Sequence, residues 1–262
     1  MSAMSTPRAS ESTVRIGLVY PELLGTYGDR GNAVVLVERC RRRGIPAELV
    51  EIAADEALPD SLDLYLFGGG EDDPQSLASE RMRASSGALA RAQSTGAVVF
   101  AVCAGFQLIG TGYETGDGEM LDGLGLVDMR TVGASPRLIG EIVVEPEAAT
   151  GLPSVTGFEN HSGRTTLGPG VRPLGTVRVG GGNGVGSGDG VLAERLVGTY
   201  LHGPVLPRNP ALADFLLAWI VGRDALVPID DHLTDALRRD RLTAATATGW
   251  RARLRDLRTN RG

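Results

Sequence analysis

The sequence of 262 residues contains no lysine, so arginine supplies all 26 of its positive charges. Without lysine the chain offers no Schiff-base lysine, no lysine general base and no P-loop lysine for nucleotide phosphates. Cysteine is scarce too, with only Cys40 and Cys103. No apolar run reaches the roughly 20 residues of a membrane span, and no signal-peptide pattern is evident. We therefore expect a cytoplasmic protein with reduced thiols and no membrane insertion.

The charge is unevenly distributed along the chain. The net charge is −6, yet residues 238–262 alone carry +6, which leaves −12 for the rest. An acidic body disfavours nucleic acid as the main partner. We expect residues 1–13 to be disordered, residues 14–222 to form one domain, and residues 223–262 to form a basic helical extension lying on the acidic body.

Apolar segments alternate with helical ones over the first hundred residues. Ala97–Val102 is apolar throughout, which is typical of a central strand in a parallel sheet covered on both faces. The alternation predicts an α/β fold of the flavodoxin-like kind, mostly parallel, with helices on both faces. The other expected elements are strands at Val14–Tyr20, Ile45–Ile52 and Leu62–Phe67, and helices at Gly31–Arg43 and Gln75–Thr95.

The chain after Gly112 has short β segments separated by glycine and proline, which predict a mixed β extension. The glycine-rich stretch 180–190 satisfies no phosphate-loop pattern and is interpreted as a flexible hairpin. A helix follows at Asn209–Val221 and a surface helix at Asp231–Leu257. The expected strands are Leu138–Glu145, Val155–Glu159, Leu174–Val179 and Glu194–Tyr200.

Cys103 lies where the central strand ends and a helix must begin, in the segment F-A-V-C-A-G-F-Q-L-I-G. A lone cysteine after a strand is often only a small buried apolar residue. Here small neighbours permit the tight turn of a nucleophile elbow, and a helix N-terminus behind the thiol lowers its pKa. The backbone N–H groups of Ala104 and of Gly69 or Gly70, which follow the neighbouring strand, are candidates for an oxyanion hole.

A cysteine nucleophile for acyl transfer needs an imidazole to move protons. His202, in G-T-Y-L-H-G-P, follows a predicted strand and is the first candidate. His161, in F-E-N-H-S-G-R-T, is nearly as well placed, and His232, at the start of the last helix, is the least suitable. Position alone leaves the choice between His202 and His161 open.

Taken together, these motifs resemble class I glutamine amidotransferases of the cobyric-acid-synthase-like branch. The blocks Y-G-D-R-G-N (27–32), F-G-G-G-E-D-D-P (67–74) and G-F-E-N-H-S-G-R-T (157–165) are similar to the glutaminase subunits of lipid II isoglutaminyl synthases. The resemblance covers roughly residues 14–221. It implies hydrolysis of L-glutamine through a thioester on Cys103, with His202 as acid and base.

The same resemblance implies further roles. Gln107 and Arg137 would bind the substrate, Arg137 by holding its α-carboxylate. The ammonia would pass to a Mur-ligase-like partner of the MurT type in a heterodimer, where it would amidate D-glutamate of a peptidoglycan precursor. The resemblance implies no metal and no cofactor in this chain; ATP and magnesium are expected on the ligase. A surface ion pair remains the plainer interpretation of Arg137.

The chain departs from the family pattern at two positions. Ala101 stands where many members have glycine, two residues before the nucleophile. Pro204 stands where many have a glutamate, two residues after the catalytic histidine, so the usual third member of a triad is missing. Alternative functions are an amidotransferase domain for a corrin precursor, a cysteine hydrolase on the same fold, and a catalytically silent scaffold for a ligase.

Overall fold

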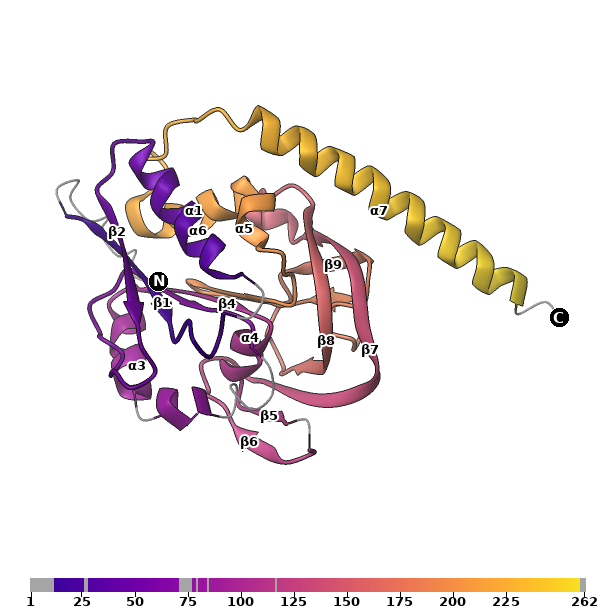
Figure 1. The fold of residues 1–262 in the computed structure, drawn as a ribbon, viewed down its shortest axis with the longest axis horizontal. Helices are drawn as coiled ribbons and strands as arrows, with labels where there is room; N and C mark the ends of the chain where they lie inside the picture. Colours follow the sequence, from indigo (N-terminus) through magenta and orange to yellow (C-terminus); the bar gives the residue numbers. More distant parts are fainter. Residues whose placement is uncertain are drawn as a thin grey trace.

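Two β-sheets stand side by side, with helices around the first and one long helix extending from the body (Figure 1). Both sheets have six strands. In the first sheet the strand order is β11-β12-β4-β3-β1-β2. The computed structural model describes residues 12–25, 28–70, 77, 78, 80–83, 85–115 and 117–259, with side chains described up to residue 247.

The first sheet is parallel except for the antiparallel pair β11 and β12 at one edge. Its central strands are buried along their whole length because helices cover both faces, as their uninterrupted apolar sequences predict. The predicted α/β fold is thus confirmed. The strands are β1 (Val14–Val19), β2 (Ala47–Ile52), β3 (Leu64–Phe67), β4 (Val98–Val102), β11 (Val191–Ala193) and β12 (Leu196–Thr199).

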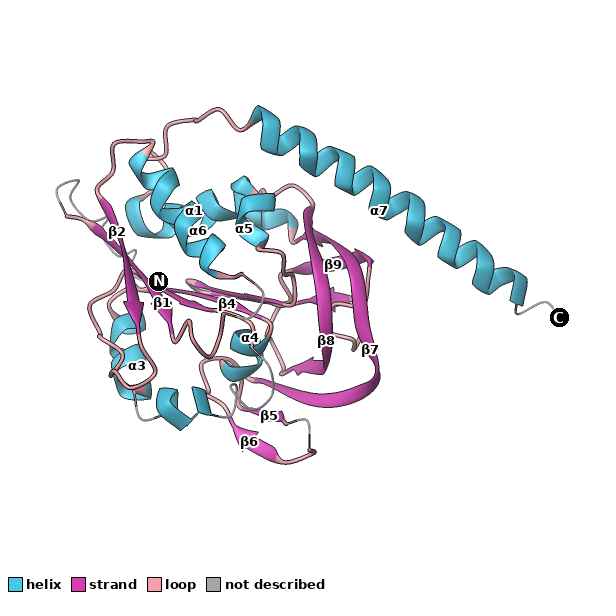
Figure 2. Cartoon of the chain, viewed as in Figure 1, coloured by secondary structure: helices cyan, strands magenta, loops and turns pink. Residues whose placement is uncertain are grey.

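Helices α1 (Arg30–Arg41) and α6 (Pro210–Val221) lie on one face of the first sheet, and α3 (Ser86–Ser94) lies on the other (Figure 2). The helix expected at Gln75–Thr95 is not continuous. Residues 77, 78 and 80–83 are helical, but Ser85 forms a turn before α3, and its hydroxyl accepts a hydrogen bond from the Leu58 N–H. Gln75 itself lies outside the described residues.

The second sheet is the predicted mixed β extension, and it hydrogen-bonds as a sheet of its own. Its two long strands pair antiparallel and extend well beyond the predicted segments. The stretch 180–187 connects β9 to β10, which confirms the predicted hairpin. The strands are β5 (Gly112–Glu114), β6 (Met120–Asp122), β7 (Met129–Pro146), β8 (Val155–Leu167), β9 (Gly175–Val179) and β10 (Gly188–Asp189).

Helix α7 (His232–Thr259) contacts the second sheet near its start and then runs away from the body (Figure 1). The extension is helical as expected, but the expectation that it lies on the acidic body is wrong beyond its start. Ion pairs hold the segment just before α7 against the body. Arg39 of α1 binds both Asp214 of α6 and Asp231, which directly precedes α7. Among the described helices, none combines the length and hydropathy of a bilayer span. The short helices are α4 (Ala104–Leu108), α5 (Val205–Arg208) and the 3₁₀ turn Ala148–Thr150.

Candidate active site

The register of the first sheet brings the predicted catalytic segments to one edge. Val102 pairs with Thr199 of β12, and Ala101 pairs with Phe67 of β3. Because these strands are parallel, the residues that follow them leave the sheet at the same end. Cys103, the loop carrying His202, and the glycine turn 68–70 therefore meet at the carboxyl edge, where α/β sheets bind their ligands.

Cys103 occupies a strained turn between β4 and α4. Its φ is +51° and its ψ is −106°, a conformation that side-chain-bearing residues rarely adopt. The backbone holds it there, since the Cys103 N–H donates to the carbonyl of Thr199 at 2.9 Å. Gly105 is required behind it, because a Cβ at that position would come within 2.6 Å of the Phe67 side chain. This strand–turn–helix geometry is that of a nucleophile elbow.

The glycine turn is tied to its surroundings at two points. The carbonyl of Gly68 accepts the Gly105 N–H at 3.0 Å, and the Gly69 N–H donates to the buried carboxylate of Asp29 at 2.7 Å. The second bond corrects our expectation for Gly69, because an N–H already engaged with a carboxylate cannot also stabilise an oxyanion. Of the predicted donors, Gly70 and Ala104 remain.

His202 is 2% exposed and lies in a loop bridged to β8. Its N–H donates to the Phe158 carbonyl at 2.8 Å, and its carbonyl accepts the Phe158 N–H at 3.2 Å. Burial, followed by electrostatic interactions with His161 and Arg137, lowers the pKa of His202 to about 4. The imidazole is thus neutral at pH 7, the state in which it can accept a proton.

His161 is buried close by in a different environment. Its ring stacks on Tyr200 with a centroid separation of 3.6 Å, and its Nε2 lies 3.7 Å from the Glu159 carboxylate. That carboxylate in turn accepts the N–H groups of Gly181 and Gly182. The structure therefore brings both candidate histidines to the site, and it places the Glu159 carboxylate next to His161.

Tyr200 is a site residue to which the sequence analysis assigned no role, although it stands in the quoted motif G-T-Y-L-H-G. Its hydroxyl contacts Gln107 at 3.3 Å and Thr165 at 2.7 Å. Burial first, and then an electrostatic interaction with Cys103, raise the pKa of Tyr200 to about 12. It follows that Tyr200 stays protonated beside the nucleophile and can orient the Gln107 carboxamide.

Gln107 and Arg137 line a cavity of about 500 Å³ together with Ser162 and Gly163. Arg137 lies where the pairing of β7 with β8 shifts register. Its Nε donates to Asn160 Oδ1 at 2.7 Å and its Nη2 to the Asn160 carbonyl at 3.0 Å, which fixes the plane of the guanidinium. The two predicted substrate-binding residues thus share one polar cavity.

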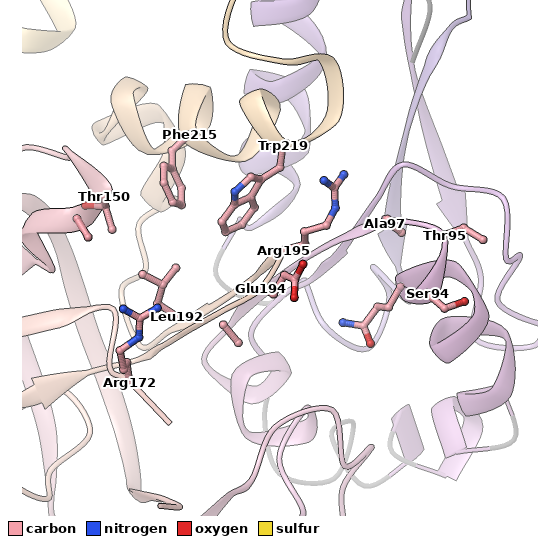
Figure 3. A pocket seen from close by; sticks show the side chains of 14 residues that line it. Ser94, Thr95, Ala97, Thr150, Arg172, Leu192, Glu194, Arg195, Phe215 and Trp219 are labelled. Carbon is pink, nitrogen blue, oxygen red and sulfur yellow. The ribbon is translucent and has the colours of Figure 1, made fainter. Parts of the chain in front are cut away.

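Other candidate features lie away from this edge. Cys40 is buried in α1, and burial raises the pKa of its thiol to about 11. His232 is exposed at the start of α7 and pairs with Asp230. A cavity of about 920 Å³, lined by Arg172, Arg195 and Trp219 among others, adjoins Ala97 at the opposite end of β4 (Figure 3).

Comparisons with known proteins agree with this geometry. Residues 15–210 match the CobB/CobQ-like glutamine amidotransferase domain. The chain is 38% identical over 196 residues to the GatD subunit of the glutamine-hydrolysing lipid II isoglutaminyl synthase of Staphylococcus aureus, covering 74% of this chain and 79% of that protein. It is 35% identical over 204 residues to the corresponding GatD of Streptococcus pneumoniae, covering 76% and 77%.

A solved structure has a similar fold. PurLQS from Thermotoga maritima superposes with a TM-score of 0.51 at 16% identity, over 79% of this chain and 99% of the matched chain. That likeness concerns the fold alone, whereas the sequence matches confirm the predicted resemblance. This chain therefore belongs to the CobB/CobQ-like glutamine amidotransferases, and among them to the family of the GatD subunits of lipid II isoglutaminyl synthase.

Proposed function

We propose that this chain hydrolyses L-glutamine through a γ-glutamyl thioester on Cys103 and supplies the ammonia to a Mur-ligase-like partner. The observation that carries the proposal is the placement of Cys103, at φ +51° on the sheet edge that also bears His202 and the glycine turn. The names of its relatives, both glutamine-hydrolysing subunits, support the same substrate.

In this reaction the Cys103 thiolate attacks the side-chain amide carbon of glutamine, and the carbonyl oxygen becomes an oxyanion facing Gly70 and Ala104. The C–N bond then breaks as the His202 imidazolium, formed when the ring took the thiol proton, protonates the leaving ammonia. Water next attacks the thioester with His202 as base, which releases glutamate and restores the thiol.

The cavity lined by Gln107 and Arg137 is the proposed site of substrate selection. Arg137, its guanidinium oriented by Asn160, can hold the α-carboxylate of glutamine by a charge-assisted hydrogen bond. Gln107 lines the same cavity and touches Tyr200, so it can position the substrate between Arg137 and Cys103.

The catalytic acid that usually orients the histidine is proposed to come from the partner. Pro204 directly precedes α5 and has no carboxylate to offer. Glu159, one alternative within the chain, already accepts two N–H groups and faces His161. The other two alternatives, Glu71 and Asp72, lie outside the described residues. A partner Asp or Glu beside His202 would also restrain glutamine hydrolysis until an ammonia acceptor is attached.

The partner is proposed to be a MurT-type ligase that uses ATP and magnesium to amidate the α-carboxyl of D-glutamate in lipid II, in a cytoplasmic heterodimer. The absence of lysine supports this division of labour, because a P-loop requires one. This chain would then need no cofactor of its own.

Co-expression with candidate ligases and an assay for ammonia release test the proposal. We expect the isolated chain to be a poor glutaminase that becomes faster in the complex. Replacing one partner Asp or Glu near His202 should remove that gain while the complex stays intact. Full activity of the isolated chain would refute the donated acid, and activity without Cys103 would refute the thioester.

A further inference from the structure

The N-terminal end of α1 is wedged between the two turns that carry the proposed chemistry. Asp29, the residue just before α1, accepts the Gly69 N–H at 2.7 Å through Oδ2 and the Asn32 carboxamide N–H at 3.2 Å through Oδ1. The Asn32 Oδ1 accepts the Leu206 N–H at 2.8 Å. Both side chains are fully buried. A chain of hydrogen bonds thus runs from the glycine turn to the segment just after His202.

Packing leaves little room for either turn to shift against α1. A Cβ on Gly31 would lie 2.6 Å from Cγ of Pro204, two residues after His202. A Cβ on Gly68 would lie 1.9 Å from the Leu24 carbonyl oxygen and 3.1 Å from Cβ of Asp29. The backbone at Gly31 is therefore packed against the Pro204 side chain, and the backbone at Gly68 is packed against the Leu24 carbonyl and the Asp29 side chain.

A buried carboxylate at position 29 lowers the stability of the folded chain. Burial raises the pKa of its carboxyl to about 6, and the hydrogen bonds that offset this cost come from an uncharged amide and an uncharged carboxamide. An apolar side chain of similar volume would avoid that cost, but it would leave the Gly69 N–H and the Asn32 carboxamide without this acceptor. The carboxylate therefore has a role that filling space does not explain.

We propose that Asp29 is a positioning residue for the oxyanion hole, and that Asn32 links it to the His202 loop. The proposal rests on the proposed glutaminase mechanism. Glycine has the greatest backbone freedom, so three consecutive glycines hold a fixed N–H direction only if neighbours constrain them. Asp29 holds the Gly69 peptide, and Gly105 holds Gly68. In this proposal the two bonds together fix the direction of the next N–H, that of Gly70, which serves the oxyanion.

Two substitutions at Asp29 separate this role from a merely structural one. Asp29→Leu fills the space but cannot accept the Gly69 N–H, so kcat for glutamine hydrolysis should fall by about 10²-fold, as for a lost oxyanion donor, with little change in KM. Asp29→Asn keeps one acceptor oxygen and should retain most of kcat. Asp214→Asn, which weakens the ion pairs between α1 and α6, is the matched control and should leave kcat unchanged.

Alkylation by iodoacetamide supplies the second measurement, because it consumes the Cys103 thiolate without forming an oxyanion. We expect the Asp29→Leu chain to be alkylated at Cys103 as fast as wild type, both alone and in complex with its ligase. If Asp29→Leu does not fold, Asn32→Ala provides the same comparison, with kcat lowered and alkylation unchanged.

Each outcome decides the matter. Unchanged kcat in Asp29→Leu would overturn the inference, as would a parallel loss of kcat and alkylation, which signals a general disturbance. Equal losses in Asp29→Asn and Asp29→Leu would also overturn it, because one acceptor should suffice. If Cys103→Ala keeps glutaminase activity, the proposed function itself fails, and that result is distinct from all of these.

Discussion

The two sheets contribute to the site in different ways. The first sheet places Cys103 and the glycine turn through backbone geometry, namely strand register and a strained turn. The second sheet places Arg137 and His161 through side-chain contacts, with Asn160 and Glu159 as their neighbours. The difference suggests a division in which the first sheet performs chemistry and the second binds substrate. Substitutions can test that division through their separate effects on kcat and KM.

The largest effect is expected at the nucleophile. Cys103→Ala should abolish glutamine hydrolysis, because no other group replaces the thiolate, while the melting temperature stays near that of wild type. Cys40→Ala is the matched control; it changes a buried cysteine of α1 and should leave ammonia release almost unaltered. Substantial glutaminase activity in Cys103→Ala would contradict the assignment of Cys103 as the nucleophile.

The two histidines allow a direct comparison of the sheets, since His202 follows β12 of the first sheet and His161 lies in β8 of the second. His202→Ala should lower kcat by at least about 10²-fold, the usual contribution of a general base. His161→Ala should cost much less. Equal small effects would remove both from the mechanism, and a larger loss at His161 would reverse the assignment.

A binding role for the second sheet predicts a smaller loss at Arg137. Arg137→Ala removes a charge-assisted pair worth about 1.5–3 kcal/mol, so kcat/KM should fall by roughly 10- to 150-fold, mainly through KM. Steady-state kinetics with glutamine provides the measurement. If the kinetics do not change, Arg137 does not bind the substrate, and its role is structural, through its hydrogen bonds to Asn160.

The pH dependence should distinguish the isolated chain from the complex. With its pKa near 4, His202 loses its ability to accept a proton only as the pH falls toward 4, so kcat/KM of the isolated chain should decline there. A partner carboxylate would favour the imidazolium and raise that pKa, moving the decline to higher pH. Profiles that superpose would argue against a donated acid.

The smallest effect on activity is expected at the other end of α1. Arg39 is 7% exposed as a side chain and pairs with Asp214 and Asp231, whose side chains are 27% and 20% exposed. Arg39→Met removes the guanidinium that these two carboxylates share, while Arg43 still pairs with Asp214, so the free energy of unfolding should drop by about 2 kcal/mol. Denaturant melts measure that loss, and kcat per folded molecule should not change.

Sequence patterns predicted the first sheet better than the second. The apolar run Ala97–Val102 can be satisfied only by a strand buried on both faces, and β4 lies there. Strands β7 and β8 instead continue through polar stretches, such as Glu159–Thr165 of β8, that carry no apolar period-two pattern. They remain strands because they pair with each other, a long-range interaction that local sequence does not reveal.

Because local sequence does not reveal long-range contacts, the sequence analysis also missed parts of the site. Cys103 and His202 stand next to strands, so their positions follow from local order. The bond between Asp29 and Gly69 joins residues 40 positions apart, and its effect on the predicted oxyanion donors becomes visible only in three dimensions. Tyr200 lies inside a recognised motif, yet its stacking on His161 depends on the meeting of the two sheets.

The order of the first sheet leaves β2 as an outer strand, and this has a consequence for the behaviour of the protein in concentrated solution. Backbone groups on an outer strand can pair with a strand of another molecule and start aggregation. Here Glu48 and Glu51 project from β2, and each forms an ion pair, with Arg15 and Arg30 respectively. If β2 of a second copy paired with β2 of the first, the glutamates of the two copies would lie close together. The charged side chains of both copies would then have to lose bound water. The outer strand thus works against self-assembly and favours colloidal stability.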